Sequence, residues 1–306
     1  MITTALKFEH KRVFNTIKIQ QKSGKLRIVN NPVADLKPIL KQFNKETTQY
    51  YHDLLMLNGL NEIPHAYLPR KSIKTNAQVH KNAPKIIKFD FAHFFDDVRF
   101  EYVEEHLFKL IPGMTHDNKH IVEHLLINPK TKGVIQGAPP SGALAGLALI
   151  PFWQELRRSL PRDIVFTQYS DDLIFSTESE TNDVFTIGQI TKKIEKALVK
   201  SKLNFTINAE KTKTQTRHFR RITGVSVNDK NQCTPSVKNH RWLRSFAHML
   251  RKNQDIVETL AHFNTEIDIV NGKIAYMHSI DETAKISALL AKHHDLFNRF
   301  GVYTGS

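Results

Sequence analysis

The sequence has little of several features that define common protein classes. One cysteine, Cys233, occurs in 306 residues, which excludes an internal disulfide and fits a reducing compartment. No run of 18 apolar residues occurs, so we expect neither a membrane span nor a membrane partner. The first 14 residues become charged at once and lack the apolar core of a signal peptide, so we expect a cytoplasmic protein.

Glycine-rich phosphate loops of the Walker or Rossmann type are also missing, as is the crossover pattern of a doubly wound fold. Acidic residues are scarce: 30 Asp plus Glu face 44 Lys plus Arg, a formal net charge of +14. Residues 186–260 alone hold 16 Lys/Arg against 5 Asp/Glu. This uneven excess predicts a polyanionic partner, most often nucleic acid, with a basic surface that has no dedicated partner as the alternative.

The apolar patterns predict a mixture of strands and helices without internal repeats. Strands are expected at 13–31 (two strands around a Ser-Gly turn, with a basic tip), 84–91, 204–208 and 220–227. Helices are expected at 34–57, 97–110, 187–201 and from 236 onward. Ser141 is expected to cap a further helix, which Pro151 should kink. The inward-facing residues of helix 97–110 should be Val98, Tyr102, Val103, Leu107 and Leu110.

The stretch "QYSDDLIF" (168–175) sets Asp171 and Asp172 side by side near a predicted hairpin turn between apolar, β-prone runs. Asp90 ends the strand "PKIIKFDF", and two adjacent strand ends would bring the three carboxylates together. Clustered carboxylates repel one another and raise each other's pKa, so they need a cation. Two Mg²⁺ ions suit such oxygen ligands and in-line phosphoryl transfer. A solvated turn is the alternative for an isolated Asp-Asp pair.

Five motifs, in order, resemble those of reverse transcriptases. "FDFAHFF" (89–95) looks like their first metal-binding motif, and "YSDD" (169–172) looks like their Y-x-D-D box. "QGAPPSG" (136–142) is similar to their Q-G-x-P-x-S loop. "NAEKT" (208–212) and "RRITG" (220–224) resemble the lysine-bearing segment and the turn that grips the primer end. The resemblance implies an enzyme, an RNA-directed DNA polymerase.

Further motifs resemble those of retron reverse transcriptases in particular. "NAQVH" (76–80) matches their N-A-x-x-H motif, and Ile222-Thr223-Gly224 stands where Val-Thr-Gly is usual. The resemblance extends from about residue 18 to 301, although "PPSG" replaces the commoner loop ending. It implies a dedicated structured non-coding RNA as template and primer, priming from a 2′-OH, and an RNA–DNA product called msDNA. It also implies anti-phage defence with a separate effector protein.

The resemblance gives roles to residues around the metals and the nucleotide. Asp90, Asp171 and Asp172 would hold two Mg²⁺, or Mn²⁺ in their place, helped by the Phe91 carbonyl; Asp172 is either a full ligand or a supporting charge. Phe95 would lie under the sugar and select dNTPs; the alternative is a core position, which either Phe94 or Phe95 could occupy. The other predicted dNTP contacts are Gln136, Gly137, Lys25, Arg27 and Lys211.

Some of these roles have a structural alternative. Lys25 and Arg27 would clamp the triphosphate or be solvated charges. Lys211 would protonate the pyrophosphate, neutralise it, or be a surface lysine.

Other residues are expected to contact nucleic acid. Thr223 and Gly224 would form a tight turn under the primer strand. Asn76 and His80 would either contact RNA or stabilise the fingers. From 236 onward, Leu243, Phe246, Ala247 and Leu250 form an apolar helix face. Arg241, Arg244, His248 and Arg251 form a basic face suited to an RNA–DNA duplex backbone, with a solvated amphipathic helix as the alternative.

Two further features were weighed. His116, His120 and His124 recur every four residues, and they are interpreted as a polar helix face rather than a zinc site, because no cysteine lies nearby. Only 82 residues follow Gly224. This is enough for a thumb but not for an RNase H domain as well, so a host RNase H is the expected partner for template removal.

The predicted fold is α+β, a right-hand polymerase with an antiparallel palm sheet. Fingers are expected at 1–85, with 98–145 contributing, the palm at 86–227 and a helical thumb at 228–306. Three rivals remain. One is another bacterial defence polymerase, of the abortive-infection or diversity-generating type. The others are an RNA-dependent RNA polymerase and a non-catalytic RNA-binding protein on a polymerase scaffold.

Overall fold

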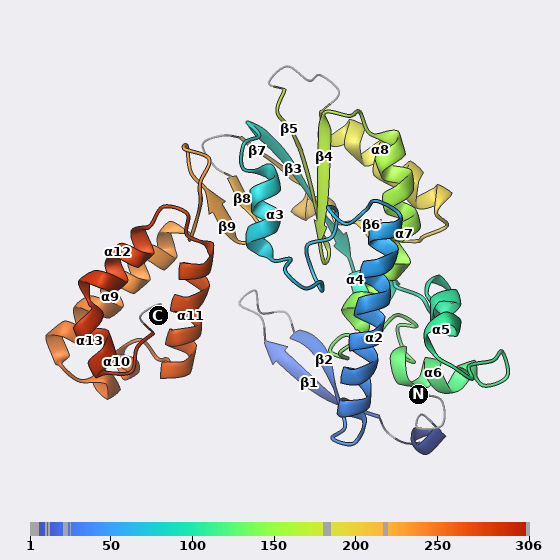
Figure 1. Ribbon diagram of the computed structural model, residues 1–306, viewed down its shortest axis with the longest axis horizontal. Coiled ribbons are helices and arrows are strands. Elements are labelled where there is room, and N and C mark those ends of the chain that lie inside the picture. Colours follow the sequence, from blue (N-terminus) through green and yellow to red (C-terminus); the bar gives the residue numbers. More distant parts are fainter. Residues whose placement is uncertain are drawn as a thin grey trace. The chain divides into compact units, whose positions relative to one another are not determined.

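The computed structural model describes residues 6–9, 11, 13–20, 24, 26–179, 185–216 and 220–303, without the side chain of Arg27. They form two compact units (Figure 1). Unit 1 comprises Met1–Lys71, Ile87–Phe175 and Thr181–Lys213, and unit 2 comprises Ser72–Ile86, Ser176–Glu180 and Thr214–Ser306. None of the described helices is both long and apolar enough to cross a bilayer. The division into fingers, palm and thumb stays a prediction.

A five-stranded sheet carries the apolar strands that the sequence predicts. Its strand order is β4-β5-β3-β6, and β7 also pairs with β3. The strands are β3 (Lys85–Ala92), β4 (Ile164–Tyr169), β5 (Asp172–Thr177), β6 (Thr206–Ile207) and β7 (Lys213–Thr216). Strands β3 and β6 are antiparallel, with Phe91 opposite Ile207. The predicted strand 84–91 and the hairpin that turns near Ser170 and Asp171 are confirmed.

The predicted hairpin at 13–31 is also confirmed. Strands β1 (Phe14–Gln20) and β2 (Leu26–Pro32) pair antiparallel, from Phe14 opposite Pro32 to Gln20 opposite Leu26. Apart from Phe14, the side chains of β1 are exposed. The ribbon therefore offers its side chains to solvent or to a ligand rather than to the core.

Helices of unit 1 pack around the sheet. They are α2 (Leu36–Leu57), α4 (Phe94–Asp97), α5 (Glu104–Leu110), α6 (Lys119–Leu126), α7 (Ser141–Ser159) and α8 (Ile187–Lys200); a 3-10 turn, η1, spans Leu6–Phe8. In α7, Trp153 Nε1 donates to Gln168 Oε1 of β4 at 2.6 Å. Tyr51 of α2 packs against Gly146, where a Cβ would lie 2.3 Å from the Tyr51 ring. The predicted helices 34–57 and 187–201 are confirmed.

Two expectations about unit 1 are wrong. Residues 97–110 do not form one helix: Val98 is extended, a 3-10 turn (η2, Phe100–Tyr102) follows, and α5 begins at Glu104. Val98 is buried and its carbonyl accepts a hydrogen bond from Val134 N at 3.0 Å, so a tertiary contact interrupts the helix. Ser141 is not the helix cap, because its hydroxyl donates to the Ile135 carbonyl at 2.6 Å.

Other expectations about segment 97–110 and helix α7 agree more closely with the structure. Of the residues expected to face inward, Val98, Val103 and Leu107 are buried, and Tyr102 and Leu110 are partly buried. Helix α7 continues through Pro151, and the kink there stays a prediction.

Unit 2 contains a small antiparallel sheet of order β10-β9-β8. Its strands are β8 (Arg220–Ile222), β9 (Val225–Val227) and β10 (Cys233–Thr234). The single strand predicted at 220–227 is therefore wrong, since Thr223 (φ 45°) and Gly224 (φ 93°) form a tight turn in its middle. A left-handed pair of residues reverses the chain and pairs β8 with β9.

The C-terminal helices of unit 2 bury a core of their own. They are α9 (Val237–Asn253), α10 (Ile256–His262), α11 (Ile267–Ile280), α12 (Lys285–Lys292) and α13 (His294–Arg299). Ser236 caps α9, accepting from Asn239 N at 3.3 Å. The predicted apolar face is confirmed, because Leu243, Phe246, Ala247 and Leu250 are all buried in this core.

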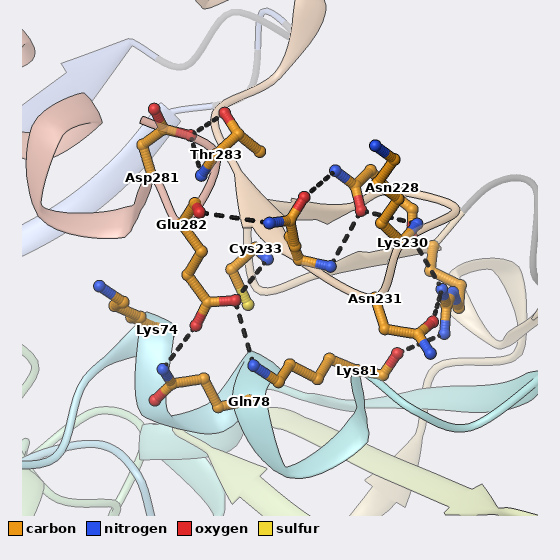
Figure 2. Close-up of polar contacts among 12 residues, drawn as sticks. Lys74, Gln78, Lys81, Asn228, Lys230, Asn231, Cys233, Asp281, Glu282 and Thr283 are labelled. Carbon is orange, nitrogen blue, oxygen red and sulfur yellow. Dashed lines mark hydrogen bonds and ion pairs between the residues drawn. The ribbon is translucent and has the colours of Figure 1, made fainter. Parts of the chain in front are cut away.

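Helix α3 (Ile73–His80) is tied to the rest of unit 2 by polar contacts (Figure 2). Glu282 Oε1 accepts from Gln78 Nε2 at 2.7 Å, and Glu282 Oε2 lies 3.2 Å from Lys81 Nζ. The same oxygen accepts from Cys233 N at 2.9 Å. One carboxylate thus joins α3, strand β10 and the segment before α12.

Arg220 makes a second connection to the end of α3. Its buried guanidinium donates to the carbonyls of Lys81 and Ala83 at 2.6 and 2.7 Å. It also donates to Asn228 O at 3.1 Å and Asn231 Oδ1 at 2.8 Å. A buried charge needs such partners, and these acceptors join β8 to the chain after α3 and to the β9–β10 turn.

Candidate active site

Three carboxylates converge where β3 meets the β4–β5 turn. Asp90 lies on β3, Asp171 lies in the turn and Asp172 begins β5. One carboxylate oxygen from each lies within 4.8 Å of the other two. The described part of the chain holds no second group of three or more metal-ligating side chains. The structure therefore brings together the three aspartates that the sequence singled out.

Backbone hydrogen bonds fix this convergence. Phe91 N donates to Asp171 O at 2.9 Å, and Asn208 N donates to Asp90 O at 2.8 Å. Phe89 and Phe91 on either side of Asp90 are buried. Side chains alternate between the two faces of a strand, so Asp90 points to the face opposite that of Phe89 and Phe91. The apolar flanks therefore make the carboxylate positions rigid.

Two lysines face the carboxylates. Lys211 Nζ lies 2.9 and 3.0 Å from the two oxygens of Asp90, and Lys88 Nζ lies 2.7 Å from Asp172 Oδ2. Lys211 follows β6 and is more than half exposed, whereas Lys88 on β3 is mostly buried. Counted over the described residues, these two positive charges do not balance three negative ones, so the cluster retains an attraction for cations.

Burial and neighbouring charges shift the pKa values of this cluster. Burial raises the pKa of Asp171 above its usual value, and the charge of Asp90 raises it further. Burial also raises the pKa of Asp172, while Lys88 opposes the rise. The hydrogen bond to Asp90 raises the pKa of Lys211, which keeps it an ammonium. The two aspartate shifts thus follow mainly from burial, and the Lys211 shift follows from its contact with a carboxylate.

The two phenylalanines after Asp90 occupy different environments. Phe94 is buried and stacks on Phe91 with ring centroids 6.4 Å apart. Phe95 is partly buried and meets two rings edge-on: Phe94 at 5.3 Å and Tyr67 at 6.3 Å. Phe95 is thus the ring of this pair with an accessible surface, and its predicted contact with the sugar stays a prediction.

The predicted nucleotide loop lies against β2. Gln136 O accepts from Asn30 N at 2.8 Å, and Gly137 has a positive φ of 107°. A Cβ on Gly137 would lie 2.7 Å from Asn30 O, so backbone conformation and space both require glycine here. Lys25 and the Arg27 side chain lie outside the described residues, although the Arg27 backbone pairs with Ile19.

In unit 2, Asn76, Ala77 and His80 of the "NAQVH" motif are buried, whereas Gln78 and Val79 are exposed. Asn76 Nδ2 donates to Thr223 Oγ1 at 3.3 Å, and His80 Nδ1 lies 2.7 Å from Ser176 Oγ. Both side chains are fully buried. The turn at Thr223 and Gly224 is therefore held from α3 by a side-chain contact that the sequence did not indicate.

The basic face of α9 is solvent-exposed. Arg241, Arg244, His248 and Arg251 are exposed, and Arg251 also contacts His293 Nδ1 at 3.0 Å. The three histidines of the 116–124 row have separate partners. His116 packs on Phe108, His120 contacts Glu9 and Asp117, and His124 lies 3.1 Å from Lys11 O. They belong to no metal-ligating group among the described side chains.

Sequence patterns missed three residues beside the carboxylates: Lys88, Gln168 and Tyr67. Lys88 carries a detectable signal, since a lysine two positions before Asp90 lies on the same face of β3. Gln168 is buried in β4, and its Nε2 donates to Ser170 O at 2.8 Å. Tyr67 lies in a loop more than 20 residues before Asp90, and no periodicity relates the two residues.

Comparison with known proteins identifies the family. The family described as "Reverse transcriptase (RNA-dependent DNA polymerase)" matches residues 17–254, and the chain belongs to this family. Reverse transcriptase domains depend on divalent metal ions. The donor set fits this requirement, because three close carboxylates present the hard oxygen ligands that such ions prefer.

Two curated relatives are retron reverse transcriptases from Myxococcus xanthus. The retron Mx65 reverse transcriptase is 27% identical over 293 residues, covering 89% of this chain and 62% of the relative. The retron Mx162 reverse transcriptase is 24% identical over 307 aligned positions, covering 91% and 60%. The chain thus spans about three fifths of their length. The resemblance to retron reverse transcriptases is confirmed.

Solved structures with a similar fold include two yeast telomerases. Apo telomerase from Candida tropicalis has a TM-score of 0.55 at 12% identity, covering 94% of this chain and 58% of that one. Telomerase from Candida albicans, in complex with a fragment of telomeric RNA, has a TM-score of 0.54 at 11% identity, covering 96% and 56%. The predicted α+β fold of a right-hand polymerase is confirmed.

Proposed function

We propose that this protein is an RNA-directed DNA polymerase of the retron type, which copies a cognate structured non-coding RNA into msDNA from dNTPs. The observation that carries the proposal is the cluster of Asp90, Asp171 and Asp172 within 4.8 Å, in a chain of the reverse transcriptase family. The formal net charge of +14 suits a nucleic-acid partner. A role in anti-phage defence with a separate effector completes the proposal, on the similarity to retron enzymes.

The three aspartates, with the Phe91 carbonyl, are assigned to hold two Mg²⁺. Bound there, the ions would lower the pKa of the primer hydroxyl and neutralise charge on the triphosphate. The chain's own contribution is to hold the carboxylates in place through the backbone contacts of Phe91 and Asn208. Lys211, an ammonium next to Asp90, supplies a positive charge for the leaving pyrophosphate.

Phe95 is proposed to exclude ribonucleotides, since a fixed ring under the sugar collides with a 2′-hydroxyl. Its accessible position, unlike that of Phe94, suits this role. Gln136 and Gly137 would lie over the incoming nucleotide. Lys25 and Arg27 would clamp its triphosphate from the basic hairpin.

In unit 2, Thr223 and Gly224 are proposed to support the primer end. The burial of Asn76 and His80 favours a supporting role for both over direct RNA contact. The exposed Arg241, Arg244 and Arg251 suit contact with the backbone of an RNA–DNA duplex. Each single replacement of one of these arginines by Gln should reduce the steepness of the plot of log affinity against log salt concentration by up to about 1.

Incorporation of labelled dNTPs on a primed RNA template tests the catalytic assignment. The Asp171→Asn/Asp172→Asn variant should lose at least about 100-fold of the wild-type rate while retaining RNA affinity. Asp295→Asn, which changes a fully exposed aspartate, is the matched control and should keep the wild-type rate. Undiminished synthesis by the double variant would overturn the mechanism.

Sequencing of the nucleic acid that co-purifies with the protein tests the retron assignment. We expect one DNA species joined to one structured RNA through a 2′ linkage. DNA of many sequences, or DNA that is not joined to RNA, would instead indicate an abortive-infection or diversity-generating enzyme. Bound RNA without any DNA would indicate a non-catalytic RNA-binding protein.

A further inference from the structure

Tyr67 lies beside the turn that carries the catalytic aspartates. Its hydroxyl is 2.7 Å from Ser170 Oγ, and Ser170 directly precedes Asp171. Its ring meets Phe95 edge-on, with centroids 6.3 Å apart and planes at 62°. One side chain therefore contacts both the aspartate turn and the ring proposed to select the sugar.

The loop that carries Tyr67 is fixed to the strand that leads into this turn. His65 N donates to Gln168 O, and Gln168 N donates to Ile63 O, both at 2.8 Å. Tyr67 itself has a left-handed backbone, with φ at 62°. This conformation is uncommon for residues other than glycine and costs about 1–2 kcal/mol. The position of Tyr67 relative to β4 is thus set by backbone pairing.

The aspartate turn needs support, because Ser170 is also left-handed, with φ at 57°. Two side chains hold it. Gln168 Nε2 donates to the Ser170 carbonyl at 2.8 Å, and the Tyr67 hydroxyl meets the Ser170 hydroxyl. Gln168 is in turn fixed by Trp153 Nε1 at 2.6 Å. If the Tyr67 hydroxyl were removed, only the Gln168 contact of these two would remain to support the turn.

The ring of Tyr67, which is 44% exposed, also contacts the start of α7. A Cβ on Gly142 would lie 2.4 Å from Cγ and Cδ1 of Tyr67. The ring therefore cannot move toward the helix at this point, and Phe95 contacts both Tyr67 and Phe94. Edge-to-face aromatic contacts of this kind stabilise a defined relative orientation of the rings.

We propose that Tyr67 is a positioning residue with two separable effects on DNA synthesis. Its hydroxyl holds the turn before Asp171 and so affects the rate of nucleotide transfer. Its ring supports Phe95 and so affects discrimination between deoxy- and ribonucleotides. This inference rests on the proposed function, because both effects are defined by dNTP incorporation.

Two substitutions separate the effects. Tyr67→Phe should lower kcat for dNTPs about threefold to tenfold, as expected for loss of one hydrogen bond, while KM and the dNTP/rNTP ratio of kcat/KM stay within twofold of wild type. Tyr67→Ala should lower kcat similarly and also lower the dNTP/rNTP ratio about threefold to tenfold. A merely structural role would lower the rates for both nucleotides equally and leave the ratio unchanged.

Gly142→Ala tests the ring without altering Tyr67. The new methyl must displace the ring, so the dNTP/rNTP ratio should fall as in Tyr67→Ala. In the Tyr67→Ala background the same change should have little further effect, because no ring remains to be displaced. Gly188→Ala at the start of α8, where a Cβ has open space, is the matched control and should behave as wild type.

The outcomes separate this inference from the proposed function. A wild-type protein that incorporates no dNTP would overturn the proposed function. An active wild type whose ratio is unchanged in both Tyr67→Ala and Gly142→Ala would overturn the role of the ring alone. A Tyr67→Phe variant with wild-type kcat would overturn the role of the hydroxyl. If Tyr67→Ala does not fold, Gly142→Ala and Tyr67→Phe decide the two points.

Discussion

Lys88 Nζ lies 2.7 Å from Asp172 Oδ2, and both side chains are mostly buried. Asp172 thus forms an ion pair with a lysine of β3, the strand that also carries Asp90. Burial raises the pKa of Asp172, and Lys88 is the main influence that opposes the rise. Asp90 is paired in the same way with Lys211, so two of the three carboxylates each contact a lysine.

Replacing Lys88 by Met should move the acidic limb of the pH–rate profile to higher pH. Without the ammonium, burial and the neighbouring carboxylates raise the pKa of Asp172 further, so the carboxylate protonates at higher pH. Initial rates of dNTP incorporation between pH 5 and 9 measure the shift. Lys130→Met, which changes an exposed lysine, should leave the profile in place. An unshifted Lys88→Met limb would contradict the role given to Lys88.

In the metal-free protein, the contribution of Asp171 and Asp172 to stability should fall as pH rises above the ordinary aspartate pKa of 3.8. The pKa values of Asp171 and Asp172 are raised on folding, so the folded state binds more protons than the unfolded state in this window. Stability is therefore lost as pH rises through the raised values. Asp171→Asn removes part of this dependence and should raise Tm at neutral pH in EDTA.

Thermal unfolding with and without Mg²⁺ completes the comparison. We expect the ion to bind only the folded cluster, so it should raise the Tm of the wild type and of Asp295→Asn. It should raise the Tm of Asp171→Asn much less. Equal shifts for all three proteins would show that Mg²⁺ stabilises the chain elsewhere.

Glu282→Ala should destabilise unit 2 by about 1.5–3 kcal/mol, because it removes a charged acceptor shared by Gln78, Lys81 and Cys233 N. Glu282→Gln, which keeps an acceptor oxygen, should cost less. Urea unfolding in a Trp153→Phe background lets Trp242 report on unit 2.

Glu266→Ala at the start of α11 is the matched control, since the Glu266 side chain is exposed and makes no capping bond. Burial raises the pKa of Glu282, but the Cys233, Gln78 and Lys81 contacts outweigh it and hold the pKa below the usual 4.5. Its contribution should therefore be lost as pH falls below about 4.5. Equal stabilities of Glu282→Ala and Glu266→Ala would contradict the joining role of Glu282.

Cys233 should resist thiol reagents in the folded protein. Burial raises the pKa of its thiol to about 12, so almost no thiolate forms at pH 8. Labelling by a maleimide at pH 8 should be slow in buffer and fast in denaturant. Glu282→Ala should accelerate it in buffer, because β10 loses the acceptor of Cys233 N. Rapid labelling of the folded wild type would contradict the described burial.

Much of the fold was readable from local patterns. Alternating and continuous apolar runs predicted the hairpin at 13–31, the strand at 84–91 and the apolar face of α9, and all were confirmed. The errors lie where distant residues compete with local preference. Val98 leaves the helical path for a hydrogen bond with Val134 N, and Ser141 turns its hydroxyl to Ile135 O instead of capping α7.

The sequence by itself determined the identity of the carboxylates and the family, because motif residues and their order are encoded along the chain. Only the tertiary structure decided what surrounds them: Lys88 beside Asp172, Tyr67 against Ser170 and Phe95, and Glu282 against α3. These partners come from segments far apart in sequence or carry no periodic signal. Their meeting depends on strand pairing and on the need of buried polar groups for partners, which act only once the chain is folded.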